Sequence, residues 1–392
     1  MTFPLAPRSK DRMLPITMAK RVLFLTGTRA DYGKLKPLIV ESCRAENIVT
    51  HIFVTGMHML RQYGSTHTEV VHSEAIIFKF KNQSSGDPDF LISAKTLSAL
   101  GAYVLSNDID LVIVHGDRLE ALAGAQVGVM TNTLVAHVEG GELSGTVDDS
   151  YRHAITKLAH IHFVANMSAK KRLLKMGELE ERIHVIGSPE LDLMHSANLP
   201  TLAEAQKRYA IPFEEYGIVI FHPVVTEKEE SIRYASELKE SILASNINWV
   251  LIESNNDQGS DGIRKVMKEV LQSKRIRSLP SMRYEYFLVL LQHSRVVLGN
   301  SSVGVREAPH YGIPSVNIGT RQRGRTNSPM VYHAGNSSSE IAKGLSWAKT
   351  CSRVPDQRFG DGKSAFRFAR LLGESKLFST PIQKSLHEDD EN

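Results

Sequence analysis

The segment HVEGGELSGTVDDSYRH, residues 137–153, holds four carboxylates: Glu139, Glu142, Asp148 and Asp149. Neighbouring carboxylates can have different pKa values, so that one accepts a proton while another keeps its own. The segment has no cysteine and no D-x-D motif of the kind that holds a divalent metal in many transferases. We therefore expect acid–base chemistry and no metal site. A carboxylate-bound metal is one alternative, and a helix cap at Asp148 or Asp149 is another.

A fifth carboxylate, Asp117, ends the apolar run DLVIVHGD, and Glu139 and Glu142 follow the run TLVAHV. Short apolar runs of this kind predict buried parallel strands. The carboxyl ends of parallel strands meet at one edge of a sheet, which is where ligands bind in such folds. The sequence therefore predicts that Asp117 and the acids of residues 137–153 face one site.

The segment LGNSSVGVREAPHYG predicts a strand end followed by a helix that starts near Val303. Ser301 and Ser302 would lie at the N-terminus of that helix, where free backbone N–H groups and the helix dipole attract an anion such as phosphate. The alternative is that one serine is only an N-cap. Arg321, in IGTRQRGR after the next predicted strand, favours the anion because its guanidinium can pair with phosphate.

Three more residues are candidates for ligand contact. Arg29 and Lys34 follow the first predicted strand in TGTRADYGKLKP, which fits neither G-x-G-x-x-G nor the Walker pattern, so the fingerprints for NAD and ATP are absent. Glu307 lies five residues after Ser302 on the same predicted helix, where a carboxylate can accept hydrogen bonds from both hydroxyls of a ribose. The alternatives are that Arg29 and Lys34 are solvated surface charges and that Glu307 faces solvent.

The elements that must position these residues form an α/β pattern. From Arg21 onward, apolar runs ending in Gly, Asp or Ser alternate with amphipathic stretches, which predicts a doubly wound parallel sheet with crossover helices. After a polar interval, a second such series begins with GIVIFHP and continues through WVLIESN, RVVLGNSS and PSVNIG. We expect a loose extension over 1–20, domains over 21–195 and 210–360, and a C-terminal helix with an acidic tail over 361–392.

Bulk properties agree with two globular domains. The chain has 392 residues, 42% of them hydrophobic, and a formal net charge of +4, a balance that argues for neither nucleic acid nor membrane as partner. Cys43 and Cys351 are the only cysteines, which excludes a disulfide framework and favours the reducing cytosol. No apolar run approaches the length of a membrane-spanning helix.

Seven segments of the chain resemble the hydrolysing UDP-N-acetylglucosamine 2-epimerases. In order along the chain they are TGTRADYGKLKPL, HGDRLEALAGA, HVEGGELSGTVDDSYRHAITKLAHIHFVAN, GSPELD, FHPVVT, GNSSVGVREAP and IGTRQRGR. The resemblance runs from about Arg21 to Arg325. It implies the GT-B architecture, two Rossmann-like domains with the active site between them. It also implies a C-terminal helix that returns to the first domain and a homodimer or homotetramer.

The resemblance further implies a reaction without a cofactor. UDP is eliminated anti from UDP-N-acetylglucosamine (UDP-GlcNAc) to give 2-acetamidoglucal, and syn addition of water then yields N-acetylmannosamine (ManNAc) for sialic acid synthesis. Asp117, one of Glu139 and Glu142, and Asp148 match the catalytic acids.

Other matches concern the nucleotide. Arg118, Ser302, Glu307 and Arg321 match positions that hold it, and Asn255 and Arg283 match its uracil pocket. We expect Arg29, His222, Arg321 and the helix N-terminus to stabilise the departing UDP.

Three alternatives remain open from the sequence. A hydrolysing epimerase for a UDP-2,4-diacetamido-6-deoxy sugar, as in legionaminic acid synthesis, would use the same chemistry and differ only in contacts to C4 and C6 of the sugar. A GT-B glycosyltransferase would consume a UDP-sugar only when an acceptor is present. A regulator that binds a nucleotide sugar would bind UDP-GlcNAc without turnover.

Overall fold

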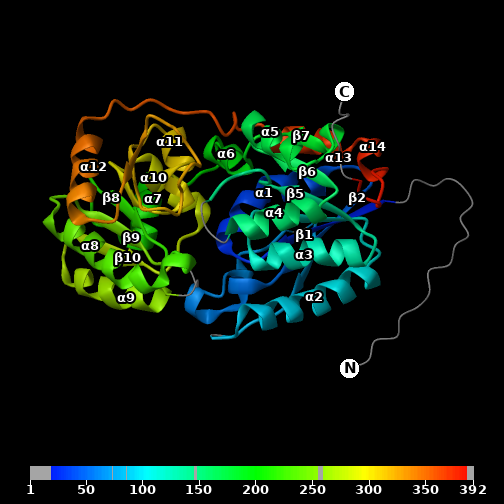
Figure 1. Ribbon diagram of the computed structural model, residues 1–392, viewed down its shortest axis with the longest axis horizontal. Helices are drawn as coiled ribbons and strands as arrows, with labels where there is room; N and C mark the ends of the chain where they lie inside the picture. The colour runs from blue at the N-terminus through cyan, green and yellow to red at the C-terminus, as the bar shows by residue number, and fades with distance from the viewer. Residues whose placement is uncertain (1–18, 73, 85, 145–147, 255–258, 386–392) are drawn as a thin grey trace, which may run out of the picture.

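The computed structural model describes residues 19–72, 74–84, 86–144, 148–254 and 259–385. Within these residues the chain forms two parallel sheets, one of seven strands and one of six, each flanked by helices (Figure 1). The α/β fold predicted from the alternating apolar runs is confirmed.

The first sheet has the order β3-β2-β1-β4-β5-β6-β7, and the second has the order β10-β9-β8-β11-β12-β13. The strands of the first sheet are β1 (Lys20–Thr26), β2 (Ile48–Val54), β3 (Ile76–Lys79), β4 (Leu111–His115), β5 (Leu134–Val138), β6 (Ile161–Val164) and β7 (Ile183–Val185). Those of the second are β8 (Gly217–Ile220), β9 (Trp249–Ile252), β10 (Ile276–Leu279), β11 (Val297–Gly299), β12 (Ser315–Ile318) and β13 (Val331–Ala334). The winding direction reverses between β1 and β4 and between β8 and β11, and ligands bind at such switch points in open α/β sheets.

Helices follow most strands. Those before the second sheet are α1 (Arg29–Arg44), α2 (Asp89–Ser106), α3 (Leu119–Met130), α4 (Asp148–Leu158), α5 (Met167–Lys175), α6 (Pro189–Met194) and α7 (Leu202–Tyr209). The later ones are α8 (Ser231–Ala244), α9 (Ser260–Met267), α10 (Tyr284–Gln292), α11 (Glu307–His310), α12 (Ser338–Thr350), α13 (Ser364–Leu372) and α14 (Ser375–Phe378). Short 3-10 helices are η1 (Gly56–Met59), η2 (Arg61–Tyr63), η3 (Thr66–Thr68), η4 (Glu180–Arg182), η5 (Val225–Glu230), η6 (Lys268–Gln272) and η7 (Ser302–Gly304).

The strands are apolar on both sides because both faces of each sheet are covered. In β1, Val22 and Phe24 pack toward α1 and α13, while Leu23 and Leu25 pack toward α2, α3 and α4. The second sheet is covered in the same way by α7 and α10 on one face and by α8, α9 and α12 on the other. This two-sided burial explains why the strands appear in the sequence as continuous apolar runs.

The chain returns to the first domain after α12, as Figure 1 shows. Phe368 of α13 lies between Phe24 and Phe163, with ring centroids 6.2 and 5.2 Å away. Asp192 of α6 accepts a hydrogen bond of 3.0 Å from the backbone N–H of Ser364, where α13 begins. The C-terminal helix therefore forms part of the core beneath the first sheet.

No helix within the described residues is long and apolar enough to cross a lipid bilayer. α6 packs on α1 and α13, and α7 packs on α10, so the chain passes from the first sheet to the second between these two helices. The domain limits given above, 21–195 and 210–360, stay a prediction, and the acidic tail over 386–392 lies outside the described residues.

Candidate active site

A cleft with a volume of about 340 Å³ lies between the strand ends of the two sheets. From the first domain, the predicted site residues that line it are Arg29, Lys34, Asp117, Arg118, Glu139 and Asp148. From the second domain, those that line it are His222, Ser301, Ser302, Glu307 and Arg321. The two switch points thus open into one site, with acids concentrated on one wall.

Asp117 follows β4 and is held by a buried arginine of its own domain. Its carboxylate pairs with the guanidinium of Arg152, a side chain on α4 that is 1% exposed, while Asp117 itself is 25% exposed to the cleft. Burial alone raises the pKa of Asp117, but the charges of Arg152, Arg325 and Arg321 outweigh it and lower the pKa to about 2. Asp117 is therefore an anion at neutral pH and a weak proton acceptor.

Glu139 follows β5 in a turn that few residue types can form. Its φ of 71° lies in the left-handed region, and so does the φ of 73° at Gly141, where a Cβ would meet the carbonyl oxygen of Ala169 at 2.5 Å. The turn directs the Glu139 carboxylate toward the cleft, where its Oε2 lies 3.2 Å from Nε2 of His115. Burial and the charge of Lys34 lower the pKa of His115 to about 3, so this imidazole is neutral.

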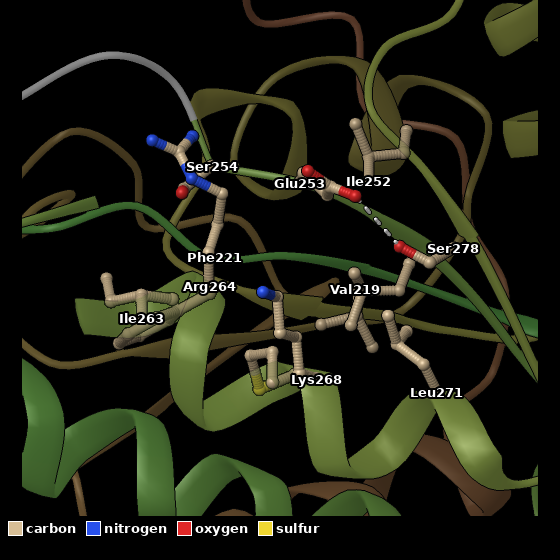
Figure 2. Close-up of a pocket in the computed structure, with 12 residues that line it drawn as sticks. Val219, Phe221, Ile252, Glu253, Ser254, Ile263, Arg264, Lys268, Leu271 and Ser278 are labelled. Carbon is tan, nitrogen blue, oxygen red and sulfur yellow. Dashed lines mark hydrogen bonds between the residues drawn. The ribbon is translucent and has the colours of Figure 1, made fainter. Parts of the chain in front are cut away.

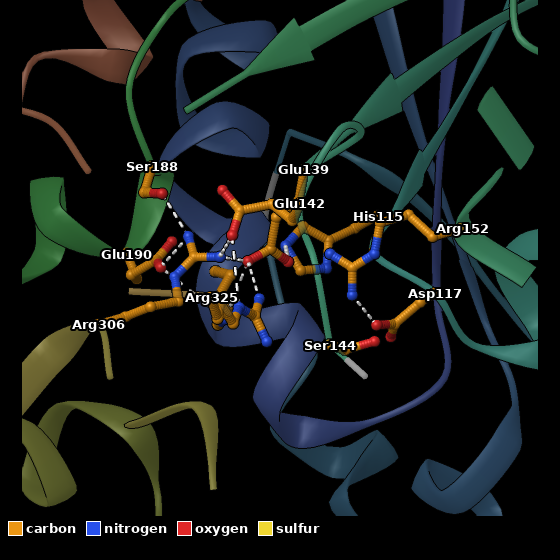
Figure 3. Close-up of polar contacts among 12 residues, drawn as sticks. His115, Asp117, Glu139, Glu142, Ser144, Arg152, Ser188, Glu190, Arg306 and Arg325 are labelled. Atoms are coloured by element: carbon orange, nitrogen blue, oxygen red, sulfur yellow. Dashed lines mark hydrogen bonds and ion pairs between the residues drawn. The ribbon is translucent and has the colours of Figure 1, made fainter. Parts of the chain in front are cut away.

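Cations from both domains surround Glu139 (Figure 3). Arg306 contacts it directly, Nη2 of Arg325 lies 3.3 Å from its Oε1, and Nζ of Lys34 lies 3.7 Å from the same oxygen. Arg306 and Arg325 belong to the second domain. Glu139 is therefore an acid whose charge is balanced mainly from across the cleft.

The first turn of α4 carries both aspartates of the TVDDS segment. Among the described residues the helix begins at Asp148. Asp149 accepts hydrogen bonds of 2.8 Å from the backbone N–H and the hydroxyl of Ser144, which ties the first turn of α4 to Ser144. Asp148 instead borders the cleft, with one oxygen 3.8 Å from Nη2 of Arg321.

The turn after β11 differs from the prediction. No continuous helix starts near Val303: a single 3-10 turn, η7, precedes the four-residue α11. A helix this short has little dipole, so the anion site predicted from the helix N-terminus is not supported in that form. The side chain of Ser301 caps η7 by accepting from the N–H of Val303 at 3.5 Å, which confirms the N-cap alternative, although Ser301 and Ser302 both still line the cleft.

Glu307 does not face solvent. It is 1% exposed, and its Oε1 accepts a 3.0 Å hydrogen bond from the hydroxyl of Tyr284. Its other oxygen has no hydrogen-bond partner among the described residues. A buried carboxylate with an unused acceptor beside a cleft is suited to a ligand hydroxyl.

His222 and the arginines frame the remaining edge of the cleft. The backbone of His222 exchanges hydrogen bonds of 2.7 and 2.8 Å with the amide side chain of Asn300, which joins the ends of β8 and β11. Nη1 of Arg321 donates to the carbonyl of Asn300 at 3.3 Å. Arg29 crosses between domains, donating to Oγ of Ser281 at 2.8 Å, so it is not a free surface charge.

The sequence profile described as UDP-N-acetylglucosamine 2-epimerase matches residues 41–373 of the chain. The chain belongs to the UDP-N-acetylglucosamine 2-epimerase family.

It is 44% identical over 374 residues to the UDP-N-acetylglucosamine 2-epimerase of Neisseria meningitidis serogroup B, with 93% of this chain and 98% of that protein covered. It is 34% identical over 377 residues to the hydrolysing UDP-N,N'-diacetylbacillosamine 2-epimerase of Legionella pneumophila, with 94% and 99% covered. A crystal structure of a UDP-GlcNAc 2-epimerase from Neisseria meningitidis bound to UDP-GlcNAc has a TM-score of 0.75 at 19% identity, covering 90% of this chain and 99% of that one. That structure has the same fold.

Two predicted residues of this epimerase-family chain, Glu142 and Arg283, do not line the cleft. Glu142 is 3% exposed and faces the arginines behind Glu139, with its Oε2 3.4 Å from Nε of Arg325. Arg283 precedes α10, and its backbone N–H donates to the hydroxyl of Tyr209 at 2.9 Å. Asn255 lies outside the described residues.

Four charged residues in or near the cleft were not predicted from the sequence: Arg152, Glu190, Arg306 and Arg325. Arg306 was hidden because it stands beside Glu307 in a segment interpreted as a helix, where one charge among several carries no signal. Arg325 lies in the same arginine-rich loop as the predicted Arg321, but this loop forms turns in which Arg321 and Arg325 line the cleft and Arg323 is exposed, a difference that the sequence does not indicate. Within the described residues, no group of three or more His, Cys, Asp or Glu side chains is placed so that it could hold a metal ion.

A second, smaller hollow lies within the second domain (Figure 2), with a volume of about 100 Å³. Apolar side chains from β8, β9 and α9 line most of it, and Oγ of Ser278 donates to Oε1 of Glu253 at 3.4 Å on its rim. Glu253 and Ser254 also line the main cleft. The hollow therefore lies next to the strand end where the resemblance predicts uracil.

Proposed function

We propose that this protein is a hydrolysing 2-epimerase that converts UDP-GlcNAc and water into ManNAc and UDP. One observation supports this most strongly: a single cleft has carboxylates on the first-domain wall, with Asp117 held ionised, and, on the second, an arginine with a buried carboxylate that has an unused acceptor. Such a cleft suits a substrate that develops positive charge on its sugar while an anionic nucleotide departs.

The chemistry explains why two kinds of carboxylate are needed. The hydrogen on C2 of the sugar is not adjacent to a carbonyl, so it becomes acidic only as the C1–O bond breaks and C1 gains positive charge. Asp117, with its low pKa, is a poor base but a permanent anion that stabilises this cation. Glu139 lines the cleft and Glu142 does not, so we assign removal of the C2 proton to Glu139.

The remaining residues are assigned from their place around the cleft. Glu307 accepts the ribose hydroxyls through its unused oxygen, and Arg321 holds the diphosphate with Ser301 and Ser302. Asp148 lies beside Arg321 at the phosphate end and moves protons during hydration. His222, Arg29 and Arg118 complete the site for the departing UDP, whereas Lys34 lies 3.7 Å from Glu139 and supports the acid wall.

The test is incubation with UDP-GlcNAc and no acceptor, in D₂O and in ¹⁸O-labelled water. We expect UDP and ManNAc by NMR, with deuterium at C2 of the sugar because that proton returns from solvent. The ¹⁸O label should appear at C1 of the sugar and not in UDP, because the C1–O bond breaks. Release of N-acetylglucosamine without deuterium, or no release of UDP, contradicts the proposal.

A second substrate is supported by the Legionella pneumophila relative, whose name specifies UDP-N,N'-diacetylbacillosamine. The elimination and hydration are the same for both sugars, since only groups at C4 and C6 differ. The ratio of kcat/KM for the two nucleotide sugars decides between them.

We also propose that the protein is a homodimer or homotetramer. Sedimentation of the purified protein measures its oligomeric state.

A further inference from the structure

Six charged side chains at the wall of the cleft and behind it form what we call the cross-domain cluster: Lys34, Glu139 and Arg325, which line the cleft, and Glu142, Glu190 and Arg306, which do not. Every one of these side chains is at most 10% exposed. With all three carboxylates ionised, the four first-domain members carry two negative charges in excess, and the two arginines of the second domain balance them. Buried charges are tolerated only when paired, so the cluster is neutral only while the domains lie together.

Arg306 is the centre of the cross-domain cluster (Figure 3). Its guanidinium contacts Glu139, lies 3.4 Å from Oε2 of Glu142 and lies 2.5 Å from Oε1 of Glu190. It also donates to the hydroxyl of Ser188 and stacks on the ring of Phe359, with 4.9 Å between its Cζ and the ring centroid. With 0% of its side chain exposed, Arg306 cannot act on a ligand directly.

We propose that Arg306 is a positioning residue that keeps Glu139 ionised and aimed at the sugar only while the two domains are closed. The proposal rests on the function proposed above. Arg306 holds Oε1 of Glu139, which leaves Oε2, 3.2 Å from Nε2 of the neutral His115, as the oxygen without a cationic partner and the one that takes the proton. Any separation of the domains removes Arg306 and Arg325 from Glu139 together.

The groups around Glu139 determine what such a separation does. Those that face it or lie one contact away are His115 of β4, Lys34 of α1, Glu142, Glu190 of α6, Arg306 and Arg325. Without the arginines, three carboxylates share one lysine, and like charges raise one another's pKa. Burial already raises the pKa of Glu190 to about 7 against the opposing charge of Lys34. Glu139 is thus a competent base only around an enclosed substrate.

A purely structural role for Arg306 is the competing explanation, because an unpaired buried Glu190 would destabilise any fold. Two variants separate the explanations. Arg306→Gln removes the cation, and the double variant Glu190→Gln with Arg306→Gln removes both the cation and the carboxyl group beside it, so that no unpaired buried carboxylate is left at Glu190. Lys36→Gln is the matched control, since Lys36 makes an ion pair between domains with Glu285 that touches no cluster member.

The readouts are Tm, UDP affinity by calorimetry, and kcat and KM for UDP release across pH. For the double variant we expect Tm near that of the wild type and UDP affinity unchanged. We expect kcat at neutral pH to fall by about a hundredfold, as for loss of an efficient proton transfer. The acid limb of the kcat profile should move to higher pH, because without the cation Glu139 loses its proton later.

A double variant that regains both Tm and the wild-type kcat profile overturns the proposal, and so does an equal shift in Lys36→Gln. If Arg306→Gln alone fails to fold, the double variant still decides. A wild-type protein without UDP release would instead remove the proposed function, so the two failures are distinguishable.

Discussion

Asp117 and Glu139 border the same cleft, but their charges are balanced from different places. The direct ion pair of Asp117 is with Arg152 of its own domain, between the end of β4 and α4, while Arg325 and Arg321 of the second domain act on it without a direct contact. Glu139 takes two of its cations, Arg306 and Arg325, from the other domain. The first pair lies within one domain, whereas the second contact exists only when both domains are in place.

This difference separates two tasks that a single acid could not perform. A fixed anion can stabilise a sugar cation at all times, and its strong pairing makes it a weak base. A base must hold and release a proton within one turnover, so linking its ionisation to domain closure restricts proton removal to a bound substrate. The predictions below break each pairing in turn.

The largest effect is expected for Asp117→Asn, which keeps the shape of the side chain and removes its charge. Turnover should fall by about a thousandfold, in the range for loss of an electrostatic contact to the transition state. UDP affinity should not change, because the proposed nucleotide contacts lie mainly on the second domain. The control is Asp110→Asn, near the start of β4, where the carboxylate pairs with Lys20 at 3.1 Å far from the cleft. Near-normal turnover in Asp117→Asn would remove this residue from the mechanism.

The sequence predicted the fold well for a physical reason. Strands buried on both faces are continuous apolar runs, and polar residues at their carboxyl ends identify the ligand edge, so Asp117, Glu139 and Ser302 were placed correctly beside one cleft. The prediction of a helix that starts near Val303 was wrong. The segment SVGV has two β-branched residues and a glycine, all of low α-helix propensity, and it forms a short 3-10 turn instead.

The site was less predictable where pairing spans the domains. Arg306 and Glu139 are 167 residues apart, and neither the spacing nor the type of these residues indicates that they meet. The choice between Glu139 and Glu142 depended on two positive φ angles in the turn that joins them, which decide that one carboxylate faces the cleft and the other faces the arginines. Such backbone detail becomes visible only in three dimensions.

Arg152→Gln should have the next largest effect, on stability. The pKa of Asp117 falls from 3.8 to about 2 on folding, so the paired carboxylate stabilises the native state above pH 4, and this contribution is lost as pH falls toward 2. The shift, which Arg152, Arg325 and Arg321 produce together, corresponds to about 2 kcal/mol at neutral pH, and Arg152 contributes the largest part of it. The difference in Tm between wild type and Arg152→Gln should therefore be largest at pH 7 and shrink between pH 4 and pH 2. A difference that stays constant over this range would mean that the pair contributes little.

Arg321→Ala should weaken UDP binding about tenfold, as expected for a lost hydrogen bond to a charged group. The matched control is Arg323→Ala, because Arg323 lies two residues away in the same loop and is exposed. Isothermal calorimetry with UDP measures both variants. When combined with Arg321→Ala, Asp117→Asn and Arg306→Gln should still lower turnover, because these two substitutions act on the sugar and not on the diphosphate. Unchanged affinity in Arg321→Ala would refute the diphosphate contact.

The smallest effect is expected for Glu285→Gln, which breaks the pair with Lys36 between α10 and α1. This contact also joins the domains, but its side chains are 21% and 36% exposed, and pairs of this kind contribute about 0–1 kcal/mol. Turnover, its pH profile and Tm should remain close to those of the wild type. If Glu285→Gln instead shifted the pH profile of kcat as Arg306→Gln is expected to do, any loosening of the contact between the domains would be enough to shift the profile. The effect would then belong to closure in general and not to the charge that Arg306 places against Glu139.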